Sequence, residues 1–138
     1  MKKILVVFGT RPEAIKLAPI IKALKNQFQV IVCFTGQHPE MVFDILNTFK
    51  IKVDISLPRN EISTKLDLLF IDQFRNISKS ICSDKINGVV VQGDTHSTLT
   101  GGFWGVFNHI PVFHVEAGLR SGNHMKPFPE ELNRRIVG

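Results

Sequence analysis

Three carboxylates stand in short motifs whose other members include glycine, threonine and arginine. They are Asp94 in QGDT (residues 92–95), Glu116 in HVEAGLR (residues 114–120) and Glu130 in PEELNR (residues 129–134). Acids that share one cleft can act as general acid and base, because one donates a proton while another accepts one. The sequence therefore indicates an acid/base site, provided that the fold brings the three motifs together.

Two other interpretations of these acids stay open. Carboxylates that converge on one place also bind Mg²⁺. In a purely structural arrangement, Asp94 caps the helix that follows it, and Glu116 pairs with Arg120 or Arg134. The residue types favour proton transfer over these two alternatives without excluding either.

A second group of residues, 9–13, is suited to bind an anion. In GTRPE (residues 9–13), Thr10 and Glu13 have capping-box spacing and Pro12 suits the first position of a helix. The free backbone N–H groups of such a helix face an anion, and Arg11 can join them. The alternative is a well-capped helix without a ligand. Neither GxGxxG nor GxxxxGK[ST] occurs in the chain, which argues against a dinucleotide-binding dehydrogenase and a P-loop NTPase.

Gln37 and His38 form a third candidate, within TGQHPE (residues 35–40). They follow an apolar run, so they can contact a ligand at the end of a strand. Equally, they can cap a helix that Pro39 begins. The residues alone favour the capping interpretation.

Predicted strands and helices alternate along the chain, and they must position these groups. Continuous apolar, β-branched runs predict buried parallel strands, and between them apolar residues keep helical spacing. The predicted strands span residues 3–8, 30–34, 88–91 and 111–115. Apolar and polar residues alternate over residues 51–57, with Val53, Ile55 and Leu57 on one face, which predicts a short edge strand there. This rhythm predicts an α/β fold with a doubly wound parallel sheet. Ligands of such sheets bind beyond the carboxyl ends of the strands, where the candidate residues fall.

Length and composition narrow the class of protein. The chain has 138 residues, 43% of them hydrophobic and 21% charged, which is typical of one ordinary globular domain. No apolar run approaches the roughly 20 residues that span a bilayer, so we expect a cytoplasmic protein without a membrane partner. The two cysteines, Cys33 and Cys82, lack metal-ligand spacing and are expected to be reduced, buried thiols.

The formal net charge of +5 is unevenly distributed. Residues 1–25 carry a surplus of five positive charges, while the rest of the chain is close to neutral. The basic residues do not form a stripe with interleaved aromatic residues, which argues against a nucleic-acid partner. A small anionic ligand near the first strand and helix explains the surplus, and so does a solvated helix face.

The last motif opens a new helix at Pro129 that stops at Gly138 after about two turns of 3.6 residues. No linker precedes it. We therefore expect residues 1–138 to form one incomplete Rossmann-like domain, the N-terminal piece of a longer protein.

The motifs together resemble those of a known family. FGTRPEAIK (residues 8–16), GQH (36–38), GDT (93–95), HVEAGLR (114–120) and PEELNR (129–134) are similar, in order and approximate spacing, to the non-hydrolysing UDP-N-acetylglucosamine 2-epimerases of bacteria. The hydrolysing relatives carry other residues at Arg11-Pro12-Glu13 and at residues 116–120. The match covers nearly the whole chain.

This resemblance implies a glycosyltransferase-B-type fold, in which two Rossmann-like domains face each other and the chain supplies most of the first. It implies reversible epimerisation at C2 of UDP-N-acetylglucosamine to UDP-N-acetylmannosamine, by elimination of UDP to 2-acetamidoglucal and re-addition. No metal or redox cofactor takes part, the enzyme is a homodimer, and its product serves bacterial surface polysaccharide synthesis. A catalytic histidine comes from the later part of such proteins, so we expect this chain alone to be inactive.

The resemblance also implies roles for single residues. Asp94, Glu116 and Glu130 correspond to the catalytic carboxylates, and Arg11, Lys16 and Arg134 to cationic groups that bind the substrate or support the acids. Gln37 and His38 match a region that binds a second, regulatory UDP-N-acetylglucosamine, although Pro39 stands where an arginine is common. Two alternatives remain: a nucleotide-sugar glycosyltransferase of the same fold, and a non-catalytic nucleotide-sugar-binding domain.

Overall fold

The computed structural model describes residues 1–36, 39–58 and 65–138. Its sheet has five parallel strands in the order β3-β2-β1-β4-β5. The strands are β1 (Lys3–Phe8), β2 (Gln29–Phe34), β3 (Ile55–Ser56), β4 (Gly88–Gln92) and β5 (Val112–Val115). The chain builds outward from β1 to β3 and then returns to add β4 on the other side of β1, so the strand order reverses there. This topology confirms the predicted doubly wound α/β sheet.

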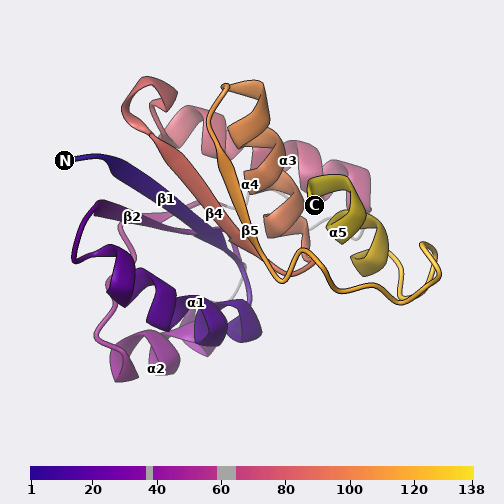
Figure 1. Ribbon diagram of the computed structural model, residues 1–138, viewed down its shortest axis with the longest axis horizontal. Helices are drawn as coiled ribbons and strands as arrows, with labels where there is room; N and C mark the ends of the chain where they lie inside the picture. The colour runs from indigo at the N-terminus through magenta and orange to yellow at the C-terminus, as the bar shows by residue number, and fades with distance from the viewer. Residues whose placement is uncertain (37–38, 59–64) are drawn as a thin grey trace.

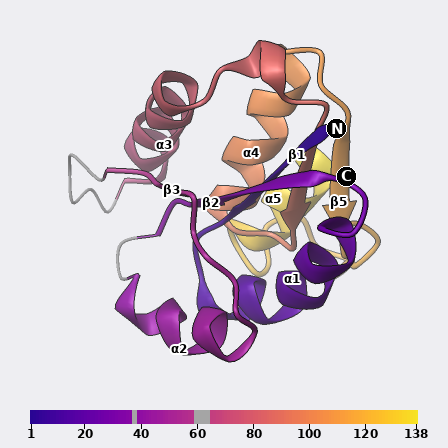
Figure 2. The same ribbon diagram turned by 90° about the vertical axis from the view of Figure 1, so that its left-hand side faces the viewer.

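Helices cover both faces of the sheet (Figure 1). They are α1 (Arg11–Leu24), α2 (Glu40–Thr48), α3 (Leu66–Ser80), α4 (His96–Phe107) and α5 (Glu130–Val137), with a short 3₁₀ turn at Ser83–Lys85. Figure 2 shows α1 and α2 on one face and α3, α4 and α5 on the other. Among the described residues, none of the helices is long and apolar enough to cross a membrane.

Each face of β1 supplies one of two cores. Ile4, Val6 and Phe8 pack with the apolar residues of α1 and α2. Leu5 and Val7 pack on the other side with α3 and α4, around the buried Trp104. Because side chains alternate along a strand, only a continuous apolar run can fill both cores. This is why β1 lies at the centre of the sheet, and why the loop that follows it is held in a fixed place.

The edge strand is shorter than expected. Only Ile55 and Ser56 pair with β2, opposite Cys33 and Phe34. The N–H of Ile51 instead bonds to the carbonyl of Leu46, so this part of the chain completes the end of α2. The expectation of one apolar face is also wrong: Val53 packs with the α1/α2 core, whereas Ile55 and Leu57 pack with the other.

Glycines let α4 lie close to the sheet. A Cβ at Gly101 would lie 2.7 Å from Val91 Cγ1, and one at Gly105 would lie 2.6 Å from Val112 Cγ2. Both distances are shorter than van der Waals contact. The close approach holds α4 against β1, β4 and β5.

The two cysteines are both free thiols, but only one is in the core. Burial raises the pKa of the Cys33 thiol to about 12, so it stays neutral. Cys82 is exposed, which corrects the expectation that both are buried. It follows α3 and precedes the 3₁₀ turn, at the surface of the molecule.

Candidate active site

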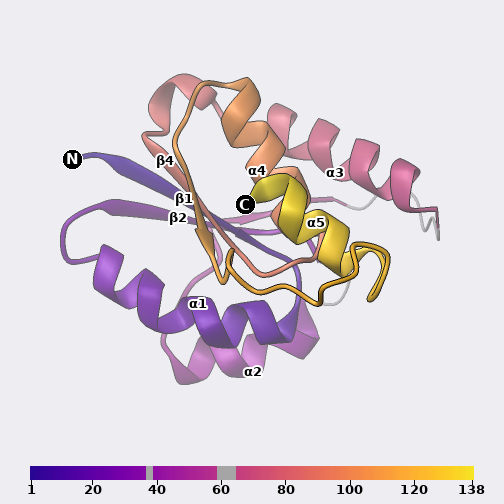
Figure 3. The ribbon, with the colours of Figure 1, turned by 45° about the vertical axis from the view of Figure 1, so that its right-hand side comes forward.

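A cleft of about 660 Å³ opens beyond the carboxyl ends of β4 and β5, between the starts of α1, α4 and α5. Its lining includes the three predicted acids and two of the predicted cations: Lys16, Asp94, Glu116, Glu130 and Arg134. These residues come from four separate segments of the chain, and Figure 3 shows α1 and α5 approaching this edge of the sheet from opposite faces. The fold therefore brings together the groups that the motifs singled out.

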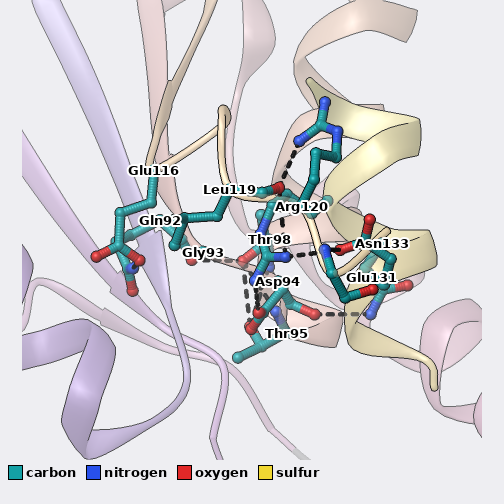
Figure 4. A network of polar contacts seen from close by, with 12 residues as sticks. Gln92, Gly93, Asp94, Thr95, Thr98, Glu116, Leu119, Arg120, Glu131 and Asn133 are labelled. Carbon is teal, nitrogen blue, oxygen red and sulfur yellow. Dashed lines mark hydrogen bonds and ion pairs between the residues drawn. The ribbon is translucent and has the colours of Figure 1, made fainter. Parts of the chain in front are cut away.

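Asp94 sits in the turn between β4 and α4. Gly93 has a positive φ of 78°, which glycine adopts without strain, and it turns the chain after β4. The N-cap of α4 is Thr95, whose hydroxyl accepts a hydrogen bond from Thr98 N–H at 3.3 Å, so Asp94 does not cap this helix. Its carboxylate pairs with Arg134 instead, and its backbone carbonyl accepts a hydrogen bond from Asn133 at 2.9 Å (Figure 4). The structural interpretation of Asp94 as a cap was wrong.

Glu116 follows β5 in an unusual backbone conformation, with φ of 65°. A non-glycine residue rarely adopts this left-handed region, and such residues cluster at functional sites. Its Oε1 lies 2.6 Å from Lys16 Nζ, and its Oε2 accepts a hydrogen bond from Gln92 at 2.6 Å. The structural alternative, in which Glu116 pairs with Arg120 or Arg134, is wrong, because Arg120 donates to the carbonyl of Leu119 and Arg134 pairs with Asp94.

Glu130 begins α5 and faces the same cleft. One of its oxygens, Oε2, is buried and has no hydrogen-bond partner among the described residues, and the same is true of Arg134 Nε. A buried polar atom without a partner costs about 1–3 kcal/mol. Folded proteins keep few such atoms, and those they keep often have a functional reason.

Glu13 is a buried acid that joins two sides of the cleft. Its Oε2 accepts hydrogen bonds from Gly9 N–H at 3.0 Å and Thr10 Oγ1 at 2.7 Å, and its Oε1 accepts one from Thr95 Oγ1 at 2.7 Å. Thr10 does not accept a bond from the helix, so the predicted capping box is replaced by this wider arrangement. Burial raises the pKa of Glu13, against the opposing effect of the hydrogen bonds from Thr95, Thr10 and Gly9.

Glu131 is fully buried beside Glu130. It lies 2.9 Å from Arg134 Nη1 and 2.9 Å from Arg135 Nε, and it accepts a hydrogen bond from Ser121 N–H at 3.1 Å. Burial by itself raises the pKa of this carboxyl. The hydrogen bonds from Arg135 and Ser121, with the charges of Arg135 and Arg134, outweigh burial and lower the pKa below its ordinary value.

Arg11 lies beside the cleft rather than in it. It lines a neighbouring cavity of about 430 Å³, between the start of α1 and the start of α4. Thr10, Pro12, Thr95 and His96 line both cavities. Arg11 is therefore adjacent to the three acids without sharing their cavity. Gln37 and His38, the candidate regulatory residues, lie outside the described residues.

His96 stands at the boundary between the two cavities, at the first position of α4. Burial lowers its pKa, while a hydrogen bond with the backbone of Leu66 and the charge of Glu130 act in the opposite direction. His96 is therefore held toward its neutral form. The sequence had not pointed to His96 as part of the site.

The magnesium interpretation finds no support in the part of the chain that the structure describes. No group of three or more His, Cys, Asp or Glu side chains there is arranged so that it could hold a metal ion. Asp94 and Glu116 are each paired with a cationic side chain instead.

Glu13 and Glu131 are parts of the site that the sequence did not predict. The spacing of Glu131, Arg134 and Arg135 is a signal that was available, because residues three and four apart on a helix are neighbours. The capping-box spacing of Glu13 predicted only a local hydrogen bond at the start of the first helix. Its bond to Thr95 spans 82 positions of sequence, and only the fold shows it.

Comparison with known proteins finds one family. The family model for UDP-N-acetylglucosamine 2-epimerase matches residues 22–138. A protein of Campylobacter jejuni named UDP-N-acetylglucosamine 2-epimerase is 43% identical over 143 residues, covering 100% of this chain and 37% of that protein.

Solved structures agree with this match. The crystal structure of UDP-GlcNAc 2-epimerase from Neisseria meningitidis bound to UDP-GlcNAc has a TM-score of 0.92 and 40% identity, covering 98% of this chain and 38% of that chain. The structure of MnaA from S. aureus with UDP has a TM-score of 0.90 and 44% identity, covering 99% and 36%. Enzymes of this kind have a glycosyltransferase-B-like, Rossmann-type fold, in agreement with the sheet described above.

The chain thus spans 37% of the length of the curated relatives it matches. Within that span, the match extends over the elements that carry Lys16, Asp94, Glu116, Glu130 and Arg134. The chain belongs to the UDP-N-acetylglucosamine 2-epimerase family.

Proposed function

We propose that the protein containing this chain interconverts UDP-N-acetylglucosamine and UDP-N-acetylmannosamine without hydrolysing them. The observation that carries the proposal is the gathering of three acids and two cations in one cleft: Asp94, Glu116, Glu130, Lys16 and Arg134. The chain supplies the first of two domains, and the second closes the site. The names and bound ligands of the related structures support the substrate class.

The reaction requires one proton transfer from C2 and one back to C2, together with the loss and return of UDP at C1. A base removes the proton from C2 of the sugar, the bond between C1 and the UDP oxygen breaks, and 2-acetamidoglucal and UDP result. In the return step, a proton reaches C2 from the opposite face while the UDP oxygen bonds to C1 again. The enzyme therefore needs acid/base groups near C2 and positive charge near the leaving diphosphate.

Lys16 and the start of α1 supply positive charge. Lys16 lies in the second turn of the helix, and its ammonium group is half-exposed at the cleft beside Glu116. The N-terminus of α1 adds the partial positive charge of a helix dipole, and Arg11 stands at its first position. We assign these groups to the diphosphate. Glu116, held by Lys16 and Gln92, acts on a sugar hydroxyl.

Asp94 and Glu130 are assigned to the proton transfers at C2. Asp94 is held by Arg134, so its carboxylate has a fixed direction. Glu130 has a buried oxygen without a partner among the described residues, which leaves it able to accept and return a proton. Groups on two different elements, the β4–α4 turn and the start of α5, can approach two faces of one carbon.

We further propose a homodimer that works in the bacterial cytoplasm and supplies surface polysaccharide synthesis. The face formed by α3 and α4 supports the dimer. Phe107 and Val106 are 66% and 63% exposed there, and Phe107 stacks on Phe103 at 5.7 Å. Exposed apolar residues that lie next to one another are typical of an interface. Sedimentation of the whole gene product tests this assignment.

The identity of the product tests the proposed reaction. The gene product that contains this chain is incubated with UDP-N-acetylglucosamine, and separately with UDP-N-acetylmannosamine, and both mixtures are followed by phosphorus and proton NMR. We expect the same equilibrium mixture of the two UDP-sugars from either side. Accumulation of UDP with free N-acetylmannosamine would show a hydrolysing enzyme. Transfer of the sugar to an added acceptor would show a glycosyltransferase.

A further inference from the structure

Glu131 is a buried charge on α5, whose residues Glu130, Asn133 and Arg134 line the cleft, but it is not itself part of the lining. Its side chain is 0% exposed, whereas those of Arg134 and Asp94 are 11% and 28% exposed. A carboxylate taken out of water is costly unless it is well paired. Here its partners lie in two places: Arg134 and Arg135 on α5, and Ser121 in the segment before the helix.

Arg134 is shared between Glu131 and Asp94. Its Nη1 lies 2.9 Å from Glu131 Oε2, and its Nη2 pairs with Asp94 Oδ2. A guanidinium is planar and rigid, so fixing one of its nitrogens fixes the direction of the other. The orientation of Asp94 is thereby coupled to Glu131, a residue that it does not touch.

Two further contacts complete the arrangement around Asp94. Asn133, also on α5, donates to the backbone carbonyl of Asp94 at 2.9 Å, so the helix holds both the main chain and the side chain of this residue (Figure 4). On the far side of Glu131, Arg135 Nε binds the other carboxylate oxygen at 2.9 Å. The network thus runs from the surface at Arg135 through Glu131 and Arg134 to the cleft.

We propose that Glu131 is a positioning residue for the epimerase reaction: it holds Arg134 in the orientation that aims the Asp94 carboxylate at the substrate. The proposal rests on the proposed function, because it assigns Glu131 a part in that reaction. Since Glu131 does not line the cleft, it acts through Arg134 and not on the substrate.

The test compares Glu131→Gln with Asp94→Asn and with the double variant, in the whole gene product. Misplacing a reacting group by about 1 Å can cost 10²-fold in rate, so we expect kcat of Glu131→Gln to fall by about 10²-fold, while KM changes less than about threefold. In the Asp94→Asn background, the same substitution should lower kcat by less than about threefold, because the group that it positions is gone. A purely structural role of Glu131 gives equal losses in both backgrounds.

Arg135→Gln is the matched control. It removes an ion pair with the same carboxylate but leaves the pair with Arg134 in place, so kcat should stay within about threefold of the wild type. If Glu131→Gln does not fold, Glu131→Asp replaces it: the charge stays, but the shorter side chain does not reach Arg134, and kcat should fall by about tenfold. Wild-type kcat in the folded variant would overturn the proposal.

A readout that needs no turnover separates this proposal from the proposed function. A guanidinium held in two ion pairs exchanges its Nη protons slowly, and its nitrogen-15 NMR signals can be assigned to Arg134 by their loss in Arg134→Lys. We expect these signals in the wild type and in Arg135→Gln, and their loss in Glu131→Gln. If the wild type lacks epimerase activity, the proposed function fails, while the NMR result still decides whether Glu131 orients Arg134. Persistence of the signals in Glu131→Gln would refute the positioning role even in an active enzyme.

Discussion

Thr95 Oγ1 donates a hydrogen bond of 2.7 Å to Glu13 Oε1, and this bond ties the start of α4 to the first turn of α1. Both residues line the cleft, and the helices that carry them, α1 and α4, lie on opposite faces of the sheet. Asp94 directly precedes Thr95, and Lys16 lies three residues after Glu13. The bond therefore sets the distance between the acid on the β4–α4 turn and the lysine on α1.

The first prediction concerns the buried acceptor of this bond. Glu13→Ala leaves Gly9 N–H and the hydroxyls of Thr10 and Thr95 without their acceptor. Buried donors without a partner cost about 1–3 kcal/mol each, so we expect a loss of about 3 kcal/mol in the free energy of unfolding. Glu13→Gln keeps the shape and one acceptor oxygen, and the loss should be about 1 kcal/mol. Urea denaturation measures both values, and equal losses in the two variants would contradict the bonding described.

Lys16 is expected to matter for activity and little for stability. Its ion pair with Glu116 is partly exposed, and such pairs contribute less than about 1 kcal/mol. The charge next to a leaving diphosphate is worth much more, so Lys16→Met should lower kcat/KM by about 10²-fold or more. Lys25→Met, at the exposed far end of α1, is the matched control and should retain wild-type kcat/KM. A stable Lys16→Met variant with full activity would show that Lys16 takes no part in the reaction.

His96 makes stability depend on pH. Burial lowers its pKa in the folded state, so unfolding takes up a proton once the pH falls below the ordinary value of 6.5. The stabilising effect is therefore present above pH 6.5 and is lost as the pH falls through the folded-state pKa. Urea denaturation between pH 8 and about pH 5 should show a steeper loss of stability for the wild type than for His96→Gln. Parallel pH profiles would show that His96 ionises as it does in the unfolded chain.

The close packing of α4 gives a prediction about stability alone. In Gly101→Ala the new methyl group would lie 2.7 Å from Val91 Cγ1 and 3.1 Å from Val7 Cβ, both in the core. Alanine favours a helix over glycine by about 1 kcal/mol, but overpacking costs about 1–3 kcal/mol, so we expect a net loss of stability. Gly118→Ala, where nothing lies within 4 Å of the new Cβ, is the control and should change stability by less than about 0.5 kcal/mol. A more stable Gly101→Ala protein would mean that α4 can move away from the sheet.

Much of the fold could be predicted from the sequence, because a buried parallel strand has a distinctive pattern. The apolar runs that became β1, β2 and β4 bury residues on both faces, as the central strands of a parallel sheet do. The run that became β5 was also expected to be buried on both faces, but β5 is an edge strand and its Phe113 is 54% exposed. The other edge strand, β3, was predicted poorly because the alternation within residues 51–57 reflected two different cores rather than one strand face.

The location of the acids could also be predicted, whereas their partners could not. Parallel strands end at one edge of the sheet, so motifs that follow β4 and β5 must converge there. Which cation pairs with which acid depends on the placement of α1 and α5, which no local pattern encodes. Glu116 therefore pairs with Lys16, which lies 100 positions away in sequence, rather than with the nearby Arg120.

Proton NMR of UDP-N-acetylglucosamine in D₂O tests the proposed epimerisation, with the gene product that contains this chain beside its Glu130→Gln variant. We expect deuterium to replace the C2 proton in both UDP-sugars as they reach equilibrium. The variant should slow this exchange by at least about 10²-fold, since a positioned acid/base contributes that much. Interconversion that retains the C2 proton, or an unchanged substrate with a folded wild-type protein, would contradict proton transfer at C2.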